Sequence, residues 1–229
     1  MRPNVAGAII VKQFQDVVKN IQVLVLFIIY PVIAVALTGA VGREMSAYFV
    51  SVFATMHCVF TPLVCTSAVI AEEKEKNTLR VLIMSNVTSL EYLVSIGAFV
   101  FLATMLTGVS FVFIGGYTGV RVIQLLLAMA VGCIISIIIG MCTGASAKNM
   151  TAANGLAVPI GMAFSFVPMV ASFNKGIENV SFVLFSQQVS YLVGGTKDFG
   201  ATAAIVIAIN FILFVTLFFF LFRRNRLDS

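Results

Sequence analysis

The stretch Ala47–Ala71, AYFVSVFATMHCVFTPLVCTSAVIA, contains 25 residues and no formal charge. It is followed at once by Glu72–Tyr92, EEKEKNTLRVLIMSNVTSLEY, which carries four acidic and three basic residues. About 20 consecutive apolar residues are needed to cross the hydrocarbon core of a bilayer, so the first stretch is long enough to span. The change in composition at Glu72 predicts the point where a spanning helix leaves the membrane.

The rest of the chain repeats the apolar pattern. Of its 229 residues, 60% are hydrophobic and 10% are charged, and the mean hydropathy is +1.08. Soluble domains average about 25% charged residues, so this chain requires lipid as its solvent. Six uncharged runs are long enough to span: Gln22–Val41, Ala47–Ala71, Leu93–Tyr117, Val122–Gly144, Ala153–Phe173 and Gly200–Phe222. The sequence therefore predicts an all-α integral membrane protein with six transmembrane helices, organised as a single domain over residues 1–229.

Lysine and arginine are distributed unevenly among the connections. With the N-terminus inside, ten of the 14 fall on the inner side, as the positive-inside rule expects. Both termini and residues 72–92 are then predicted to be cytoplasmic, in a plasma membrane that we expect to be bacterial. The net charge of +5 follows from this bias. It does not indicate nucleic-acid binding, because no basic patch with interleaved aromatic residues is present.

Residues 4–20 have the pattern of an amphipathic helix, with Val11 and Phe14 on one face and Lys12 and Gln15 on the other. Such a helix either lies in the inner interface of the membrane or is an ordinary leader to the first span. We expect an N-terminal interfacial helix.

Residues 174–199, between the last two spans, are not a polar loop. They contain two largely apolar stretches that are too short to cross, and Gly194 and Gly195 interrupt the segment. Segments of this length are typical of re-entrant or interfacial helices. A re-entrant hairpin on the extracellular side is therefore predicted.

No catalytic constellation is evident in the sequence. The phosphate-binding loop G-x-x-x-x-G-K-[ST] is missing, because no Gly-Lys pair occurs. The four cysteines all fall inside predicted spans without metal-type spacing, so they are expected to be packing residues. We therefore expect a chain that is not an enzyme and that has no catalytic, cofactor or metal site of its own.

Polar and kinked positions inside the spans are the candidates for a transport pathway. His57, the only histidine, is interpreted either as a functional intramembrane residue or as a neutral side chain bonded to a neighbouring helix. Proline removes a backbone hydrogen bond and bends a helix. The pathway candidates are His57, Pro62, Asn154, Pro159 and Pro168.

The fourth predicted span carries a small residue at every fourth position: Gly132, Ser136, Gly140 and Gly144. A face of small residues lets another helix approach closely. The pattern predicts a packing face, either within the chain or between two subunits.

Capping signals divide the charged segment. Glu72 precedes Lys76 by four residues, the favourable order for a helical ion pair. Asn77 can cap a short helix that begins at Thr78, and Thr88 begins a T-x-x-E capping box for the third span. The prediction is an extension of the second span, then a short cytoplasmic helix, then re-entry.

The predicted short helix has an apolar edge of Leu79, Leu82 and Ile83, while Arg80 and Ser85 turn elsewhere. A passive connection would be short and polar. Apolar side chains in water favour a docked protein partner over a solvated loop.

At this point the residues resemble a known family. The run EKEKNTLRVLIMSN, residues 73–86, is similar to the cytoplasmic loop of ABC transporter permeases of the type-2 export class. The resemblance extends over the whole chain, with an N-terminal interfacial helix, six spans and a hairpin between the fifth and sixth. Asn86 stands where such loops often have proline.

The resemblance implies a half-transporter that pairs with a second permease, identical or related, and with cytoplasmic ATP-binding subunits that hold the ATP and Mg²⁺. Residues 72–92 would form the coupling segment, and the hairpin would be the exit gate. An uncharged lining favours an apolar or amphipathic cargo, such as an antimicrobial peptide, a drug or a lipid-linked molecule, and sodium export stays open. The implied ATPase contacts are Glu73, Glu75, Thr78, Leu79, Leu82, Ile83 and Asn86.

Two other classes of function stay open. An ATP-independent membrane transporter or channel would need charged or densely polar spans, and this chain has few such residues. A membrane scaffold or immunity protein would bind a partner without moving anything. The sequence does not exclude either class.

Overall fold

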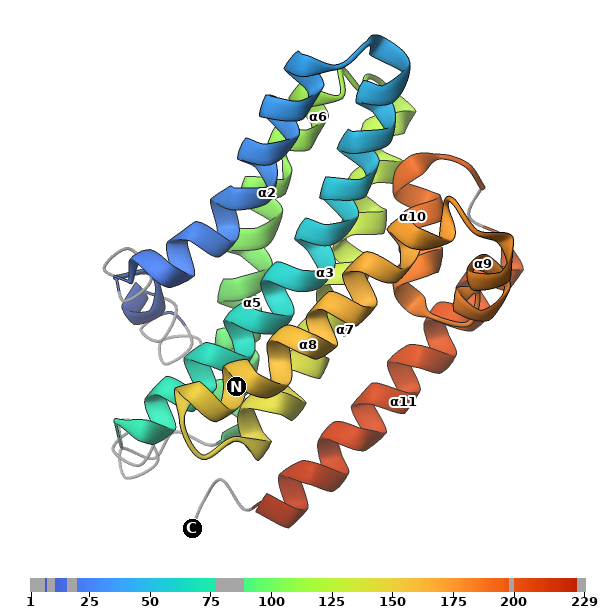
Figure 1. The fold of residues 1–229 in the computed structure, drawn as a ribbon. Coiled ribbons are helices and arrows are strands. Elements are labelled where there is room, and N and C mark those ends of the chain that lie inside the picture. Colours follow the sequence, from blue (N-terminus) through green and yellow to red (C-terminus); the bar gives the residue numbers. More distant parts are fainter. Residues whose placement is uncertain (1–6, 8–10, 16–19, 77–88, 198–199, 226–229) are drawn as a thin grey trace.

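The computed structural model of the chain is a bundle of helices (Figure 1). It describes residues 7, 11–15, 20–76, 89–197 and 200–225. All regular secondary structure in these residues is helical. The labelled helices are α2 (Ile21–Ala40), α3 (Arg43–Glu75), α5 (Ser89–Gly108), α6 (Ser110–Ile114), α7 (Val120–Ser146), α8 (Met150–Ala171), α9 (Lys175–Ser181), α10 (Phe185–Gly194) and α11 (Ala201–Asn225).

Six segments are helical, apolar and long enough to cross a bilayer: Val23–Ala40, Met45–Glu75, Glu91–Ile114, Val120–Ser146, Met150–Ala171 and Ala201–Leu221. Helices span membranes because they satisfy their own backbone hydrogen bonds, which lipid cannot do. The prediction of an all-helical chain with six segments of spanning length is confirmed for the described residues. The chain is a multi-pass membrane protein by this criterion.

Helix α3 is the central element of the bundle. Of its spanning segment, 83% is buried inside the bundle, whereas the corresponding share is 17% for α2 and 11% for α11. It contacts α2, α5, α7, α8 and α10. Because a core residue touches many neighbours at once, a displacement of α3 would have to be accommodated by most of the bundle.

The third span is divided into two helices, although the sequence predicted one continuous run. Helix α5 ends at Gly108 and α6 begins at Ser110. Around this break, Thr107 Oγ1 donates to the carbonyl of Ala103, and Ser110 Oγ donates to that of Thr107. Hydroxyl groups that bond back to the preceding turn compete with the helical ladder and bend it. The break therefore needs no proline.

Residues 174–199 contain α9 and α10, neither of which is long enough to cross a bilayer. Asn174 caps α9, because its Oδ1 accepts hydrogen bonds from the backbone N–H groups of Gly176 and Ile177. Gly195 ends α10 with a φ of 65°, a conformation that favours glycine. Helix α10 packs against α3, α7, α8 and α11 (Figure 1). The depth of this hairpin in a bilayer stays a prediction.

Candidate functional site

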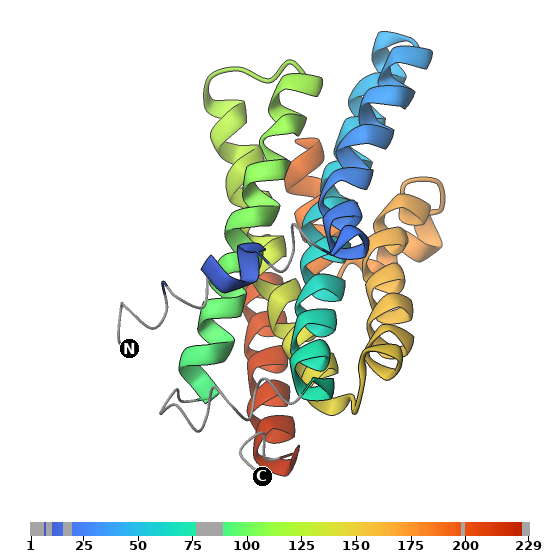
Figure 2. The ribbon, with the colours of Figure 1, turned by 90° about the vertical axis from the view of Figure 1, so that its left-hand side faces the viewer.

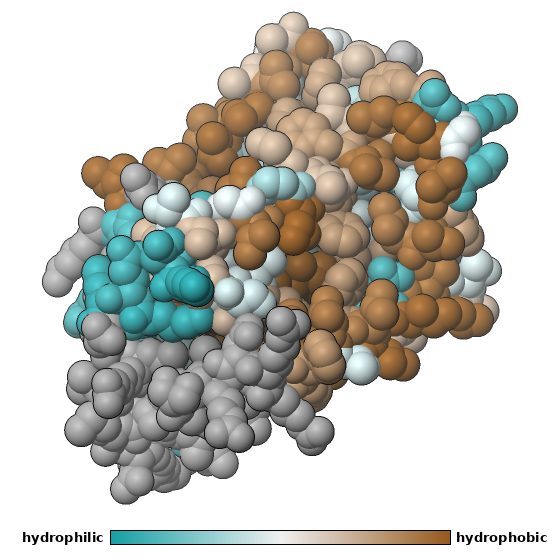
Figure 3. Space-filling model, turned by 60° about the horizontal axis from the view of Figure 1, so that its bottom comes forward, coloured by the Kyte–Doolittle hydropathy of each residue, from teal (hydrophilic) through white to brown (hydrophobic). Residues whose placement is uncertain are grey.

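The last residues of α3, Glu72–Lys76, are joined to several other parts of the chain, and we call them the charged end of α3. Figure 3 shows hydrophilic residues gathered at this end of the molecule, on a surface that is otherwise largely hydrophobic. Helix α3 continues as an α-helix through Glu75, with Lys76 as its C-cap. The predicted extension of the second span is therefore present.

Glu73 links α3 to the N-terminal segment. Glu73 is 5% exposed, and its Oε1 accepts hydrogen bonds from Lys12 Nζ at 2.6 Å and from Gln13 Nε2 at 2.5 Å. The side chain of Tyr92 on α5 lies against the same carboxylate. A buried charge is tolerated when it is paired and hydrogen-bonded. In Figure 2, the short helical segment that contains residues 11–15 lies across the bundle near α5.

Lys74 and Glu75 hold the connection between α7 and α8. Lys74 Nζ donates to the carbonyls of Ala145 at 2.8 Å and Ala147 at 2.6 Å, at the C-terminus of α7. Glu75 Oε2 accepts from the backbone N–H of Met150, the first residue of α8, at 2.9 Å. A cation is favourable at a helix C-terminus and an anion at an N-terminus. The two charges therefore stabilise the helix ends that they contact.

Glu72 and Lys76 form the ion pair that their spacing predicted. The distance from Lys76 Nζ to Glu72 Oε1 is 2.5 Å, and both side chains are partly exposed. Exposed pairs contribute about 0–1 kcal/mol. This pair is a surface contact within α3, whereas Glu73, Lys74 and Glu75 bond to other elements.

The remaining predicted ATPase contacts, Thr78, Leu79, Leu82, Ile83 and Asn86, lie outside the described residues. The structure does describe the residues immediately before them, the charged end of α3, which contacts several other elements. The N-terminal segment, α5, α7 and α8 all contact the charged end of α3. A force applied beyond residue 76 would therefore reach these four elements together.

Replacing Glu73 by alanine is expected to lower the free energy of unfolding by about 1–3 kcal/mol, because Gln13, which is 1% exposed, loses its acceptor. Glu72→Ala is the matched control, since it removes an exposed pair one residue away and should change stability by less than about 1 kcal/mol. Thermal unfolding of the purified chain in detergent measures both. Equal losses in the two variants would contradict the buried role of Glu73.

His57 lies in the bundle interior and is 0% exposed. Its Nε2 is 3.1 Å from the carbonyl of Thr104 and 3.0 Å from Thr107 Oγ1, beside the break between α5 and α6. Thr61, one turn along α3, donates to the carbonyl of Leu26 in α2. These bonds connect α3 to α5 and α2, and a role in transport stays a prediction.

The other pathway candidates differ in burial. Pro62 is buried in α3 and Pro168 is buried in α8, whereas Pro159 is exposed and Asn154 is half-buried, both on α8. Their roles stay predictions.

The small-residue face of α7 lies against α3. A Cβ atom added at Gly140 would be 2.5 Å from the carbonyl oxygen of Leu63, and one at Gly144 would be 2.9 Å from that of Ser67. Ser136 is 0% exposed, and a Cβ at Gly132 would meet Cys58 Sγ at 3.1 Å. The stripe thus brings two helix backbones together within the chain.

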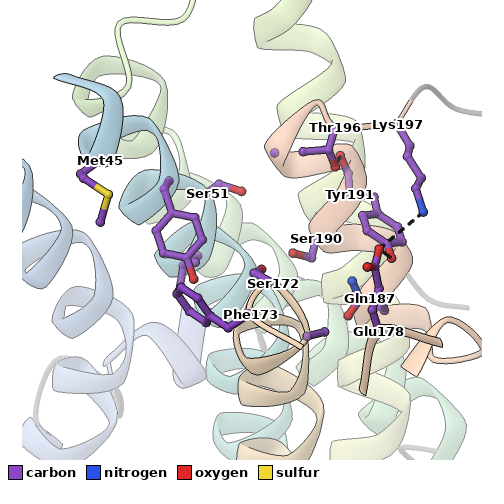
Figure 4. A pocket seen from close by; sticks show the side chains of 14 residues that line it. Met45, Ser51, Ser172, Phe173, Glu178, Gln187, Ser190, Tyr191, Thr196 and Lys197 are labelled. Carbon is purple, nitrogen blue, oxygen red and sulfur yellow. Dashed lines mark hydrogen bonds and ion pairs between the residues drawn. The ribbon is translucent and has the colours of Figure 1, made fainter. Parts of the chain in front are cut away.

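A pocket of about 560 Å³ lies at the opposite end of α3 (Figure 4). One wall comes from the start of α3 and the end of α8, and includes Met45, Ser51 and Phe173. The other wall comes from α9, α10 and the residues after α10, and includes Glu178 and Tyr191. The pocket thus joins the predicted hairpin to the central helix.

The α9–α10 wall is built around a carboxylate. Tyr191 donates from its hydroxyl to Glu178 Oε1 at 2.6 Å, and Lys197 Nζ is 3.9 Å from the same oxygen. Burial of the ring raises the pKa of Tyr191 to about 12, and the hydrogen bond to Glu178 acts in the same direction. Tyr191 therefore remains a hydrogen-bond donor throughout the physiological pH range.

Sequence reasoning missed this cluster and most partners of the charged end. The sequence places Glu178, Tyr191 and Lys197 in a predicted hairpin and indicates no role for them, although charged residues in an otherwise apolar segment are an available signal. Lys12 was placed on the polar face of the N-terminal helix, but its partner Glu73 is 61 residues away. Pairings of such separation are set by the tertiary fold.

No protein-family model matches the sequence, and a search of curated proteins finds no relative.

Proposed function

We propose that the chain is the permease subunit of an ATP-driven exporter. ATP would be hydrolysed by a separate cytoplasmic subunit, and the cargo would be apolar or amphipathic. The chain would pair with a second permease, because a half-transporter with six spans needs a partner to enclose a route. In this proposal it has no catalytic residue, and ATP and Mg²⁺ are bound by the partner.

The observation that carries the proposal is the way α3 ends. The most buried span continues into a charged end whose side chains bond to the N-terminal segment, α7 and α8. The residues that follow carry the apolar edge of Leu79, Leu82 and Ile83, which favours a protein partner. A subunit that pushes on this edge would act on the central helix and on its neighbours at once.

The composition of the spans supports transport whose energy is supplied by a subunit outside the membrane. Glu72, Glu73 and Glu75, the acidic groups of the charged end, are all engaged in contacts at the end of α3. Intramembrane carboxylates are the usual members of proton and ion relays in self-driven transporters. An external source of energy such as ATP hydrolysis fits this chain better.

Co-expression with the products of adjacent genes tests the proposal. The tagged chain is extracted in mild detergent and its complex is weighed by native mass spectrometry. We expect a mass that exceeds two 24.6 kDa chains by two further subunits, each containing a phosphate-binding loop. A complex made of the 24.6 kDa chain alone would reject the proposal.

A further inference from the structure

The pocket at the α9–α10 end of α3 has the size and composition of a small-molecule site. Its volume of about 560 Å³ falls within the roughly 300–1,000 Å³ that is typical of such sites. It combines an aromatic wall with a wall that carries hydrogen-bonding and charged groups, seen on opposite sides in Figure 4. This combination favours an amphipathic ligand.

The aromatic wall is formed by Tyr48 and Phe173. Their ring centroids are 5.8 Å apart in an edge-to-face arrangement. Phe173 is 74% exposed and Met45, at the same side of the pocket, is 51% exposed. Exposed aromatic and thioether side chains offer contact area to an apolar body.

The opposite wall already holds an ammonium group, which belongs to the protein itself. Lys197 Nζ is 3.6 Å from the centroid of the Tyr191 ring and 5.5 Å from that of Phe182. Cations are attracted to aromatic faces within about 6 Å of the ring centroid. The carboxylate of Glu178 supplies the opposite charge at 3.9 Å. An aromatic face beside a carboxylate is a chemical environment suited to an amine.

The ion pair between Lys197 and Glu178 is long and exposed to solvent, whereas the hydrogen bond from Tyr191 to Glu178 is short. The side chain of Lys197 is 50% exposed, and its distance to Glu178 lies near the limit for an ion pair. Glu178 Oε1 also accepts a hydrogen bond from the Tyr191 hydroxyl at 2.6 Å, and this bond does not involve Lys197. Exposed ion pairs contribute little to stability, so an external amine can replace this one.

We propose that the pocket binds a small amphipathic amine, with its ammonium group beside Tyr191 and Glu178 and its apolar body against Tyr48 and Phe173. Lys197 is then an internal competitor that fills the cation position when no ligand is bound. The proposal does not rest on ATP-driven export, because the pocket and the charged end lie at opposite ends of α3.

The test uses a fluorescent reporter in the pocket. The chain contains no tryptophan, so Phe173→Trp introduces a single one into the full-length protein in detergent micelles. Three probes share one aromatic body and differ in charge: 2-phenylethylammonium, 2-phenylethanol and phenylacetate. We expect saturable quenching by the ammonium compound at concentrations at least about fivefold lower than by the other two.

Two variants in this background have effects of opposite sign. Glu178→Gln should weaken binding of 2-phenylethylammonium at least about fivefold, because the charge is lost. Lys197→Gln should strengthen it about fivefold, because the competitor is lost. Lys175→Gln is the matched control, since it removes an exposed lysine from α9 that does not line the pocket, and it should have little effect.

Tighter binding in Lys197→Gln alone supports the proposal even if Glu178→Gln is not recovered as a folded protein. Weaker binding of the amine in Lys197→Gln would overturn it. So would binding of phenylacetate that equals or exceeds that of the amine, or an equal gain in Lys175→Gln. Those results would indicate an anion site or a general effect of surface charge.

Discussion

Alanine at position 140 is expected to lower the free energy of unfolding by about 1–3 kcal/mol, the usual cost of overpacking a tight interior. The new Cβ would lie 2.5 Å from the carbonyl oxygen of Leu63 and 2.9 Å from Cβ of Thr66, so α7 and α3 would have to separate. Separation also loosens the contact between α7 and α3. Alanine favours a helix over glycine by up to about 1 kcal/mol, and this gain is too small to offset the clash.

Gly155→Ala is the matched control. Gly155 is an exposed position of α8 with no atom within 4 Å of an added Cβ, so stability there should be unchanged or slightly higher. The four cysteines are free and buried, so labelling by a thiol-reactive dye reports unfolding on heating. We expect the apparent melting temperature to fall by about 5 °C in Gly140→Ala only. An unchanged melting temperature would contradict the close approach of α3 and α7.

Leu82→Asp is expected to release the proposed ATP-binding subunit from the chain. Leu82 is part of the apolar edge predicted in residues 78–86, and a carboxylate would be desolvated without a partner on docking. We expect at least about a hundredfold less co-purified subunit per chain, which corresponds to the several kcal/mol that an unpaired buried charge costs. Quantitative mass spectrometry of the affinity-purified complex measures this ratio.

Ser85→Asp introduces the same charge into the same segment, at a position that turns away from the predicted apolar edge. It should retain the subunit at close to the wild-type ratio. Loss in both variants would indicate a general effect of acidity. Full retention in Leu82→Asp would show that the apolar edge does not contact the partner.

The spans could be predicted from the sequence because lipid leaves few structural options for an apolar run. The predicted second span, Ala47–Ala71, and its charged extension correspond to α3, which ends at Glu75. The ion pair of Glu72 with Lys76 was also predictable, since it depends only on helical spacing. Each of these features is set by local sequence.

Features that depend on tertiary contacts were not predictable. The break between α5 and α6 lies beside His57, whose partners Thr104 and Thr107 are on another helix. The bonds of Lys74 go to backbone carbonyls, which no side-chain pattern identifies. The small-residue stripe predicted a close helix neighbour, but only the structure shows that the neighbour is α3.

The pocket was missed for the same reason. Its lining residues come from α3, the end of α8, α9 and α10, which are distant in sequence. Glu178 and Tyr191 are 13 residues apart and meet only because α9 and α10 fold back on each other. A reading of linear motifs cannot assemble such a site.

The central claim is that a nucleotide-hydrolysing subunit acts on this chain through the segment that follows the charged end of α3. Mg²⁺-dependent ATP hydrolysis that co-elutes with the affinity-purified chain in size-exclusion chromatography tests it most directly. The account predicts hydrolysis in the wild-type and Ser85→Asp preparations and its loss in Leu82→Asp. Absence of hydrolysis in the wild type, or equal hydrolysis in Leu82→Asp, would contradict the account.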